Sequence, residues 1–206
     1  MELYFHPMSG NSRRVVALLQ HLELAYTPHV VDLAAGEQRS PEYLALNPNG
    51  RVPTLVEDGR ALWESAAILQ RLAREHAPAL LGEDGARVEV DRWIAWALSH
   101  LSPALSRLNA ETGLRRMRGL EPAPERVAEA SREVATLLSL LDAHLATQPY
   151  LAGDGPLLPE FVVAPSLEAS MGIAKLDLEP YPHLRAWLAR TTTLPGWHAC
   201  PAAKPS

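Results

Sequence analysis

The chain has 206 residues, with 19 Lys and Arg against 24 Asp and Glu, so its formal net charge is −5. Hydrophobic residues make up 47% of the chain and charged residues 21%, which is close to the globular average and excludes wholesale disorder. A mildly acidic chain without a run of Lys or Arg is not expected to bind nucleic acid, because phosphate binding requires clustered cations. No segment approaches the roughly 20 apolar residues that span a bilayer, so no membrane partner is expected.

The chain contains a single cysteine, Cys200. One cysteine cannot form an internal disulfide, so the fold is not expected to depend on an oxidising compartment. The first residues also lack the basic start and the apolar stretch of a secretory signal. These features together predict a cytoplasmic location.

The first 79 residues alternate between strand and helix patterns. The expected strands are residues 3–5, 26–33, 54–57 and 61–63, and the expected helices are 11–22, 41–46 and 65–77. In the first helix the apolar residues recur at helical spacing, and Arg13 and Arg14 are placed on other faces. Asp58-Gly59-Arg60 predicts a hairpin turn. This order of elements predicts an α/β domain with a mixed four-stranded sheet.

After residue 80 no strand pattern occurs, and helical periods replace it. The expected helices cover residues 94–108 and 127–145, with a last one from about 182. Pro103 is predicted to kink the first of them. The expected organisation is a first domain 1–79, a linker 80–86 that contains two glycines, and an all-helical domain 87–206.

Three separated segments together resemble the cytosolic glutathione transferases, in particular bacterial, serine-type members close to the phi, theta and nu classes. The segments are His6-Pro7-Met8-Ser9-Gly10-Asn11-Ser12-Arg13-Arg14-Val15, Asn47-Pro48-Asn49-Gly50-Arg51-Val52-Pro53 and Glu64-Ser65-Ala66-Ala67-Ile68-Leu69. Their order and spacing carry the resemblance, which covers nearly the whole chain. It implies a thioredoxin-like domain that binds glutathione as co-substrate, a helical domain that supplies the electrophile pocket, and a homodimer.

Glutathione is an anionic tripeptide, so its site must hold two carboxylates. By resemblance, Ser65 grips the γ-glutamyl carboxylate where a helix begins, and Glu64 faces the amino group. Free N–H groups and the helix dipole favour an anion at that position. The alternative is that Ser65 is an ordinary helix cap. The resemblance also implies a cis Val52-Pro53 bond, which turns the Val52 backbone toward the cysteinyl part of glutathione.

Three further polar residues are candidates for the glycine carboxylate. Gln38 and Arg39 align with the polar pair that reaches this carboxylate in plant-type members, and arginine can bind a carboxylate through two hydrogen bonds. The alternative is that Arg39 is an ordinary surface residue. Arg51 stands where those relatives often keep a glutamine, and it either serves the same carboxylates or faces solvent.

Thiol activation is assigned to Ser9. A free thiol has a pKa of about 8.5, and the thiolate is the nucleophile. A hydroxyl that donates to sulfur at a helix N-terminus favours the thiolate. The alternative is that Ser9 only caps the helix, and that Asn11 or Ser12 contacts the sulfur. No cysteine lies between residues 6 and 14, which excludes the glutathionyl-enzyme chemistry of the cysteine-containing classes.

The electrophile pocket is expected between the loop near Met8 and the first helix of the second domain, around Trp96, Ser99, His100 and Pro103. No histidine spacing indicates a metal site, so no metal cofactor is expected. The predicted function is a glutathione transferase that detoxifies small electrophiles. One alternative is a glutathione-dependent disulfide reductase or peroxidase that uses the same site, and another is a non-catalytic interaction protein with the same fold.

The sequence departs from the family pattern near residue 158. The family usually places Ser or Thr, and then Asp three residues later, to cap a buried helix. Leu157 and Glu160 stand at these positions, with Pro159 between them. The hydroxyl cap is therefore expected to be lost, with partial compensation by Pro159 in the first helical turn.

Overall fold

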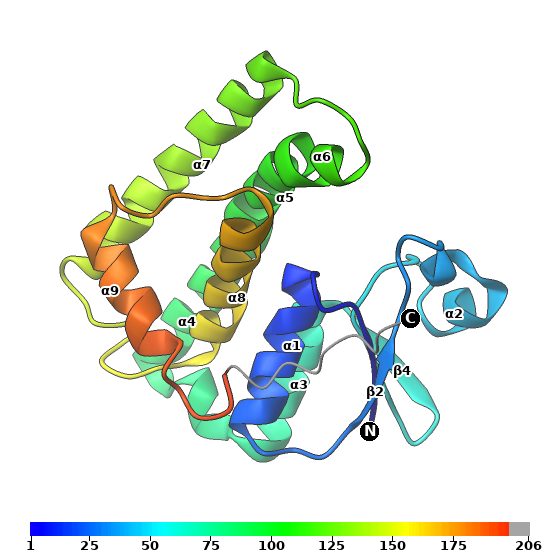
Figure 1. The fold of residues 1–206 in the computed structure, drawn as a ribbon. Coiled ribbons are helices and arrows are strands. Elements are labelled where there is room, and N and C mark those ends of the chain that lie inside the picture. The colour runs from blue at the N-terminus through cyan, green and yellow to red at the C-terminus, as the bar shows by residue number, and fades with distance from the viewer. Residues whose placement is uncertain (198–206) are drawn as a thin grey trace. The chain divides into compact units, whose positions relative to one another are not determined.

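The computed structural model describes residues 1–197, so Cys200 lies outside the described residues. Two compact units make up the chain, and Figure 1 shows their elements. Of the described residues, the first unit comprises Met1–Pro78 and residues 194–197, and the second comprises Ala79–Thr193. Within the expected linker 80–86, the 3-10 turn η2 (Pro78–Leu81) ends and helix α4 begins at Asp84.

A mixed sheet of four strands, in the order β2-β1-β3-β4, forms the first unit. Strand β1 (Glu2–Phe5) is parallel to β2 (Thr27–Val30) and antiparallel to β3 (Thr54–Glu57), which pairs antiparallel with β4 (Arg60–Trp63). The hairpin between β3 and β4 turns through two residues with positive φ, as two-residue hairpin loops require. The predicted α/β class with a mixed four-stranded sheet is therefore confirmed.

Strand β2 is shorter than the sequence pattern predicted. It ends at Val30, whereas a strand to Leu33 was expected. The Asp32 side chain explains the early end, because its Oδ1 accepts hydrogen bonds from the N–H groups of Ala34 at 2.8 Å and Ala35 at 2.9 Å. An aspartate that bonds the backbone two residues later makes a turn, which competes with continued strand pairing.

Helices cover both faces of this sheet. Figure 1 shows α1 (Gly10–His21) and α3 (Ser65–His76) together on one face and α2 (Pro41–Leu46) on the other. Leu18 of α1 and Ile68 of α3 are fully buried in the core of this unit. Helix α2 follows the 3-10 turn η1 (Glu37–Arg39), and the Ser40 hydroxyl caps it by accepting the N–H of Tyr43 at 3.1 Å.

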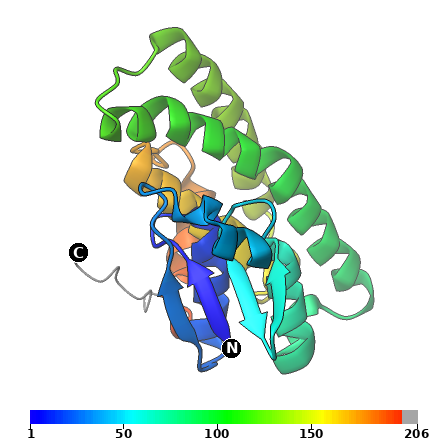
Figure 2. The same cartoon turned by 90° about the vertical axis from the view of Figure 1, so that its right-hand side faces the viewer.

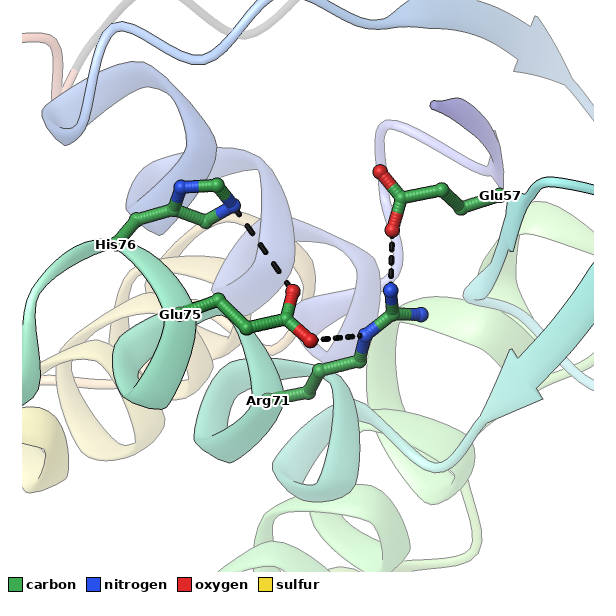
Figure 3. Close-up of polar contacts among 4 residues, drawn as sticks. All are labelled: Glu57, Arg71, Glu75 and His76. Atoms are coloured by element: carbon green, nitrogen blue, oxygen red, sulfur yellow. Dashed lines mark hydrogen bonds and ion pairs between the residues drawn. The ribbon is translucent and has the colours of Figure 1, made fainter.

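A surface ion-pair cluster joins α3 to the end of β3 (Figure 3). Arg71 donates through Nε to Glu75 at 3.0 Å and through a terminal nitrogen to Glu57. The hydrogen bond that Arg71 donates to Glu75 is the largest cause of the raised pKa of the Arg71 guanidinium. Because these side chains are about one-quarter to one-half exposed, water screens the pairs, and each contributes at most about 1 kcal/mol.

The second unit is all-helical in its described residues, which confirms the predicted second half. Its helices are α4 (Asp84–Trp96), α5 (Ser102–Asn109), α6 (Arg115–Met117), α7 (Pro124–Leu145), α8 (Leu158–Ile173) and α9 (Pro182–Thr191). Two π-helical segments, η3 (Ala97–Leu101) and η4 (Ala110–Leu114), link α4 to α5 and α5 to α6. Figure 2 shows this part of the chain as one nearly continuous rod.

A kink was predicted at Pro103, and the structure has a π-helical turn just before this residue. Pro103 has no N–H, so it cannot continue the regular pattern of helical hydrogen bonds. The N–H of Ser102 bonds to the carbonyl of Ala97, five residues earlier, which widens the helix over η3. The second π segment brings Gly113 against α8, where a Cβ would overlap the carbonyl oxygen of Ile173.

A fully buried carboxylate stabilises the start of α8. The two oxygens of Glu160 accept the N–H groups of Leu151 at 2.8 Å and Leu157 at 2.9 Å, and the indole of Trp187 donates to it at 3.4 Å. Leu157 has no side-chain acceptor, so the N–H of Glu160 lies 3.3 Å from its backbone oxygen instead. The acidic half of a capping box is thus present without the hydroxyl half.

Glu160 should make the stability of this protein depend on pH. Burial raises the pKa of the Glu160 carboxyl from 4.5 to about 7, although its hydrogen bonds oppose the shift. Between these two values the folded chain binds more protons than the unfolded chain, so the free energy of unfolding falls as pH rises, by about 3 kcal/mol in all. The Glu160→Gln variant cannot titrate and should lack this dependence. Urea unfolding of both proteins at about pH 5 and about pH 7.5 checks this, and equal pH dependence would contradict it.

Candidate functional site

The loop between β1 and α1 places Ser9 at a helix N-terminus. Ser9 is the N-cap of α1, and its Oγ accepts the N–H of Ser12 at 3.3 Å. Its own N–H donates to the carbonyl of His6 at 2.9 Å. Because a capping hydroxyl accepts through its oxygen, its hydrogen remains available to another acceptor. Capping and contact with an anion are therefore compatible roles for Ser9.

The other two candidates in this loop differ in their exposure. Ser12 is fully buried, and its Oγ accepts the N–H of His6 at 3.3 Å. Asn11 is exposed in the first turn of α1. Of the three polar side chains expected near a sulfur, Ser9 and Asn11 reach the surface and Ser12 does not.

His6 holds this loop in place. Its Nδ1 accepts the N–H of Met8 at 3.2 Å, which requires an unprotonated nitrogen. Burial lowers the pKa of the His6 ring, and the nearby Asp32 carboxylate partly opposes that shift. His6 therefore contributes to the loop geometry through its side chain and its backbone.

The segment before β3 presents a backbone edge. The Val52-Pro53 peptide bond is cis, as expected. Among the described residues, no hydrogen bond occupies the N–H or the carbonyl of Val52. An unpaired N–H and carbonyl at the end of a strand can bind an extended peptide through main-chain hydrogen bonds.

The start of α3 contains a strained residue. Glu64 is the N-cap of α3, with φ 71° and ψ 112°, and its side chain makes no capping bond. A residue other than glycine at such a positive φ costs about 1–3 kcal/mol. The alternative that Ser65 is an ordinary helix cap is therefore wrong, because Glu64 occupies the cap position and Ser65 is the first helical residue. Ser65 is only 5% exposed.

Arg14 supports Ser65 from below. It is fully buried on α1 and donates to Ser65 Oγ at 3.3 Å. Burial lowers the pKa of its guanidinium to about 10, so it remains a cation at neutral pH. Since arginine only donates, the Ser65 oxygen accepts, and the Ser65 hydrogen is left to donate to a ligand. A buried cation and the positive end of the α3 dipole thus act on the same hydroxyl.

The expectation that Arg14 lies on a polar face of its helix was wrong. Arg14 is one turn before Leu18, so both residues belong to the face that the core covers. A charged residue within an apolar stripe of a predicted helix was the available signal. Burial of such a charge is costly unless polar groups meet it, so its position indicates a polar site beneath the surface.

The candidates for a second carboxylate lie around the turn before Val52. Arg39 and Arg51 are exposed, and Gln38 is half-buried. Gly50, with φ 59°, brings the turn against η1, where a Cβ would lie 3.1 Å from the backbone oxygen of Gln38. The structure therefore brings Gln38 close to the residue that precedes Arg51.

The residues expected around an electrophile belong to both units. Met8 in the first unit is 43% exposed. In the second unit, Ser99 and His100 are exposed in η3, and the rings of Trp96 and His100 lie 6.5 Å apart. Pro103 is half-buried in α5.

A cavity of about 410 Å³ lies elsewhere in the second unit, and none of the residues expected around the electrophile lines it. Its wall includes Met171, Leu176, Leu178, Glu179, Arg185 and Leu188.

Residues 1–197 contain neither a metal-binding cluster nor a membrane-spanning helix. These residues include no cluster of three or more His, Cys, Asp or Glu side chains that could hold a metal ion. Within the same residues, every helix is too short or too polar to cross a membrane.

The first unit has the architecture of a thioredoxin-like domain, and an all-helical unit follows it. The family model described as glutathione S-transferase, N-terminal domain, matches residues 8–75, and that of the C-terminal domain matches residues 124–190. The chain is 30% identical to glutathione S-transferase 3 of Zea mays over 100% of this chain and 95% of that protein.

Solved structures agree with this similarity. A theta class glutathione S-transferase from Xanthomonas axonopodis pv. citri, with glutathione bound, is 32% identical, has a TM-score of 0.89, and aligns over 98% of this chain and 97% of that one. Glutathione S-transferase I from mais, in complex with an atrazine glutathione conjugate, is 29% identical, with a TM-score of 0.83 and 93% and 91% coverage. The chain belongs to the glutathione S-transferase family, and it is a glutathione S-transferase enzyme.

Proposed function

We propose that the start of α3 holds the γ-glutamyl end of glutathione. The observation that carries this proposal is the strained backbone of Glu64, which is retained at a helix N-terminus whose first turn contains no acidic residue. Ser65 donates its hydrogen to the carboxylate, and Glu64 faces the amino group. Arg14 orients Ser65 from beneath without touching the ligand.

The rest of the tripeptide extends from there across the first unit. Val52 pairs with the cysteinyl backbone, and Pro53 keeps that edge open. The glycine carboxylate reaches Gln38 and Arg39, with Arg51 as a further cation. The bound glutathione of the Xanthomonas relative supports this assignment by similarity. In this proposal residues 1–79 form the glutathione-binding domain and residues 87–206 contribute the electrophile pocket.

Ser9 stabilises the thiolate of the bound glutathione. Its hydrogen points to the sulfur while its oxygen caps α1, and the positive end of the α1 dipole adds to the effect. The thiol proton leaves to solvent, the thiolate attacks an electrophilic carbon, and a carbon–sulfur bond forms. In a substitution the leaving group departs with the electron pair of the broken bond. No metal ion takes part in this proposal.

The electrophile is proposed to contact Met8 together with Trp96, Ser99, His100 and Pro103. These side chains offer a thioether, two aromatic rings and a hydroxyl, a mixture that suits a flat, weakly polar molecule. The complex of the mais relative with an atrazine glutathione conjugate supports this assignment by similarity.

Removal of the Ser65 hydroxyl should weaken glutathione binding. A hydrogen bond to a charged group contributes about 1.5–3 kcal/mol, so the Kd of Ser65→Ala is expected to rise at least about ten-fold. Isothermal titration calorimetry with glutathione measures this. The matched control is Ser139→Ala, because Ser139 is an exposed serine in α7 whose hydroxyl bonds only to its own helix. An unchanged Kd for Ser65→Ala would contradict the proposed site.

Steady-state kinetics can show whether Ser9 or Asn11 stabilises the thiolate. Ser9→Ala should lower kcat with a chlorodinitrobenzene about 10–100-fold and raise the pKa of the bound thiol by about 1–2 units. Ser9→Thr, which keeps a hydroxyl, should recover much of the activity, and Asn11→Ala should change it little. Loss of turnover in Asn11→Ala alone would transfer the role to Asn11.

The same assays test the two alternative functions. Reduction of a small disulfide by glutathione, without aryl transfer, would favour the reductase or peroxidase alternative. Failure of the wild-type protein to bind glutathione would favour a non-catalytic interaction protein. Aryl transfer by a protein that binds glutathione supports the transferase function proposed here.

A homodimer in the cytoplasm completes the proposal. Trp63 on β4 is 38% exposed and Val88 on α4 is 67% exposed, and an interface that covers these apolar side chains would remove their surface from water. We expect Trp63→Glu and Val88→Glu to shift sedimentation toward a monomer. Leu120→Glu, which changes an equally apolar exposed residue beyond α6, should not. A wild-type monomer would contradict the dimer. The cytoplasmic location stays a prediction, made from the single cysteine of the sequence.

A further inference from the structure

A buried polar cluster lies beneath the proposed cysteinyl-binding edge. It consists of the side chains of Tyr43, Asn47 and Thr54 and the carbonyl of Arg51, and we call it the Tyr43 cluster. All three side chains are buried. Tyr43 Oη lies 2.7 Å from the Arg51 oxygen and 3.0 Å from Thr54 Oγ1, and Asn47 Nδ2 lies 2.7 Å and 3.1 Å from the same two atoms.

Only one arrangement of hydrogens turns all four contacts of the Tyr43 cluster into hydrogen bonds. The two amide hydrogens of Asn47 go to the Arg51 oxygen and to Thr54 Oγ1. The one hydroxyl hydrogen of Tyr43 goes to the Arg51 oxygen. The hydroxyl of Thr54 must then donate to Tyr43 Oη, because Tyr43 has no second hydrogen. Burial raises the pKa of the Tyr43 hydroxyl, so it remains a donor at neutral pH.

The cluster holds the chain on both sides of Val52 and Pro53. The Arg51 carbonyl comes immediately before this pair, and the Thr54 side chain comes immediately after it. The side-chain oxygen Oδ1 of Asn47 accepts the N–H of Asn49 at 3.0 Å, so the preceding turn is tied to the same cluster. Apolar contacts support it, because Tyr43, Val52 and Val31 pack together in one buried group.

We propose that Tyr43 and Thr54 are positioning residues that set the affinity of this enzyme for glutathione by fixing the backbone of Val52. This inference rests on the proposed function, in which Val52 pairs with the cysteinyl backbone. Neither side chain touches the ligand. Their effect is to hold Val52 in its binding conformation before glutathione arrives, which removes an ordering cost from binding.

The inference predicts a split between KM and kcat. Loss of the cluster loosens Val52, which lies in the glutathione-binding edge, and leaves Ser9 and the α1 cap unchanged. Tyr43→Phe keeps the ring in its apolar contacts and removes only the hydroxyl. Thr54→Val is close in shape and also removes a hydroxyl. In both variants we expect the KM for glutathione to rise about five-fold, with kcat within about two-fold of wild type.

Two further variants separate positioning from general stability. Thr112→Val removes another buried threonine hydroxyl, which bonds to the Leu108 carbonyl at 2.5 Å in the second unit. It should lower the free energy of unfolding as Thr54→Val does, with an unchanged KM. Thr54→Ser restores the hydroxyl and should return KM toward the wild-type value.

The outcomes distinguish this inference from the proposed function. Steady-state kinetics with glutathione and a chlorodinitrobenzene are measured for every variant, together with urea unfolding. If Ser65→Ala raises KM but Tyr43→Phe and Thr54→Val do not, the proposed site stands and the role of the Tyr43 cluster is overturned. An equal rise in Thr112→Val would also overturn it. If the wild-type protein has no affinity for glutathione, the proposed function itself fails.

Discussion

The start of α3 is the constraint on which the functional interpretation of this protein depends. Glu64 adopts a backbone conformation that costs about 1–3 kcal/mol, and the fold retains it. The first N–H groups of α3 and the Ser65 hydroxyl lie at the same helix end, and the buried guanidinium of Arg14 donates a hydrogen bond to Ser65. Two sources of positive potential, the helix terminus and the arginine, thus converge on one small region. That convergence suits the carboxylate end of a peptide better than any neutral group.

The remainder of the first unit supplies backbone geometry rather than charge. Ser9 uses its oxygen to cap α1, which leaves its hydrogen available to another acceptor, and Val52 leaves a main-chain edge open. Both features depend on rigid surroundings. The His6 ring secures the loop that carries Ser9, and the Tyr43 cluster secures the segment that carries Val52. In the proposed site, the backbone that binds glutathione is therefore held in place largely by residues that do not contact the ligand.

In the second unit, a buried polar group holds the helices together. Glu160 replaces part of a helix cap and also reaches Leu151 and Trp187, so one carboxylate connects three segments of the unit. Its burial makes it a titratable group near neutral pH. The π segment before Pro103 contains Ser99 and His100, and both residues are exposed. Irregular turns of this kind often occur at functional positions.

Sequence by itself determined the order of strands and helices, the hairpin at Asp58-Gly59 and the positions of the motif residues, because these depend on near neighbours in the chain. Only the tertiary structure decided that Arg14 is buried beneath Ser65 and that the hydroxyls of Tyr43 and Thr54 are hydrogen-bonded to each other. The spacing of hydrophobic residues predicts which face of a helix or strand is buried, but it does not predict which residues pack against that face. A side-chain partner many residues away leaves no mark on local spacing, so the hydrogen bonds that hold the candidate site in place appeared only when the chain was folded.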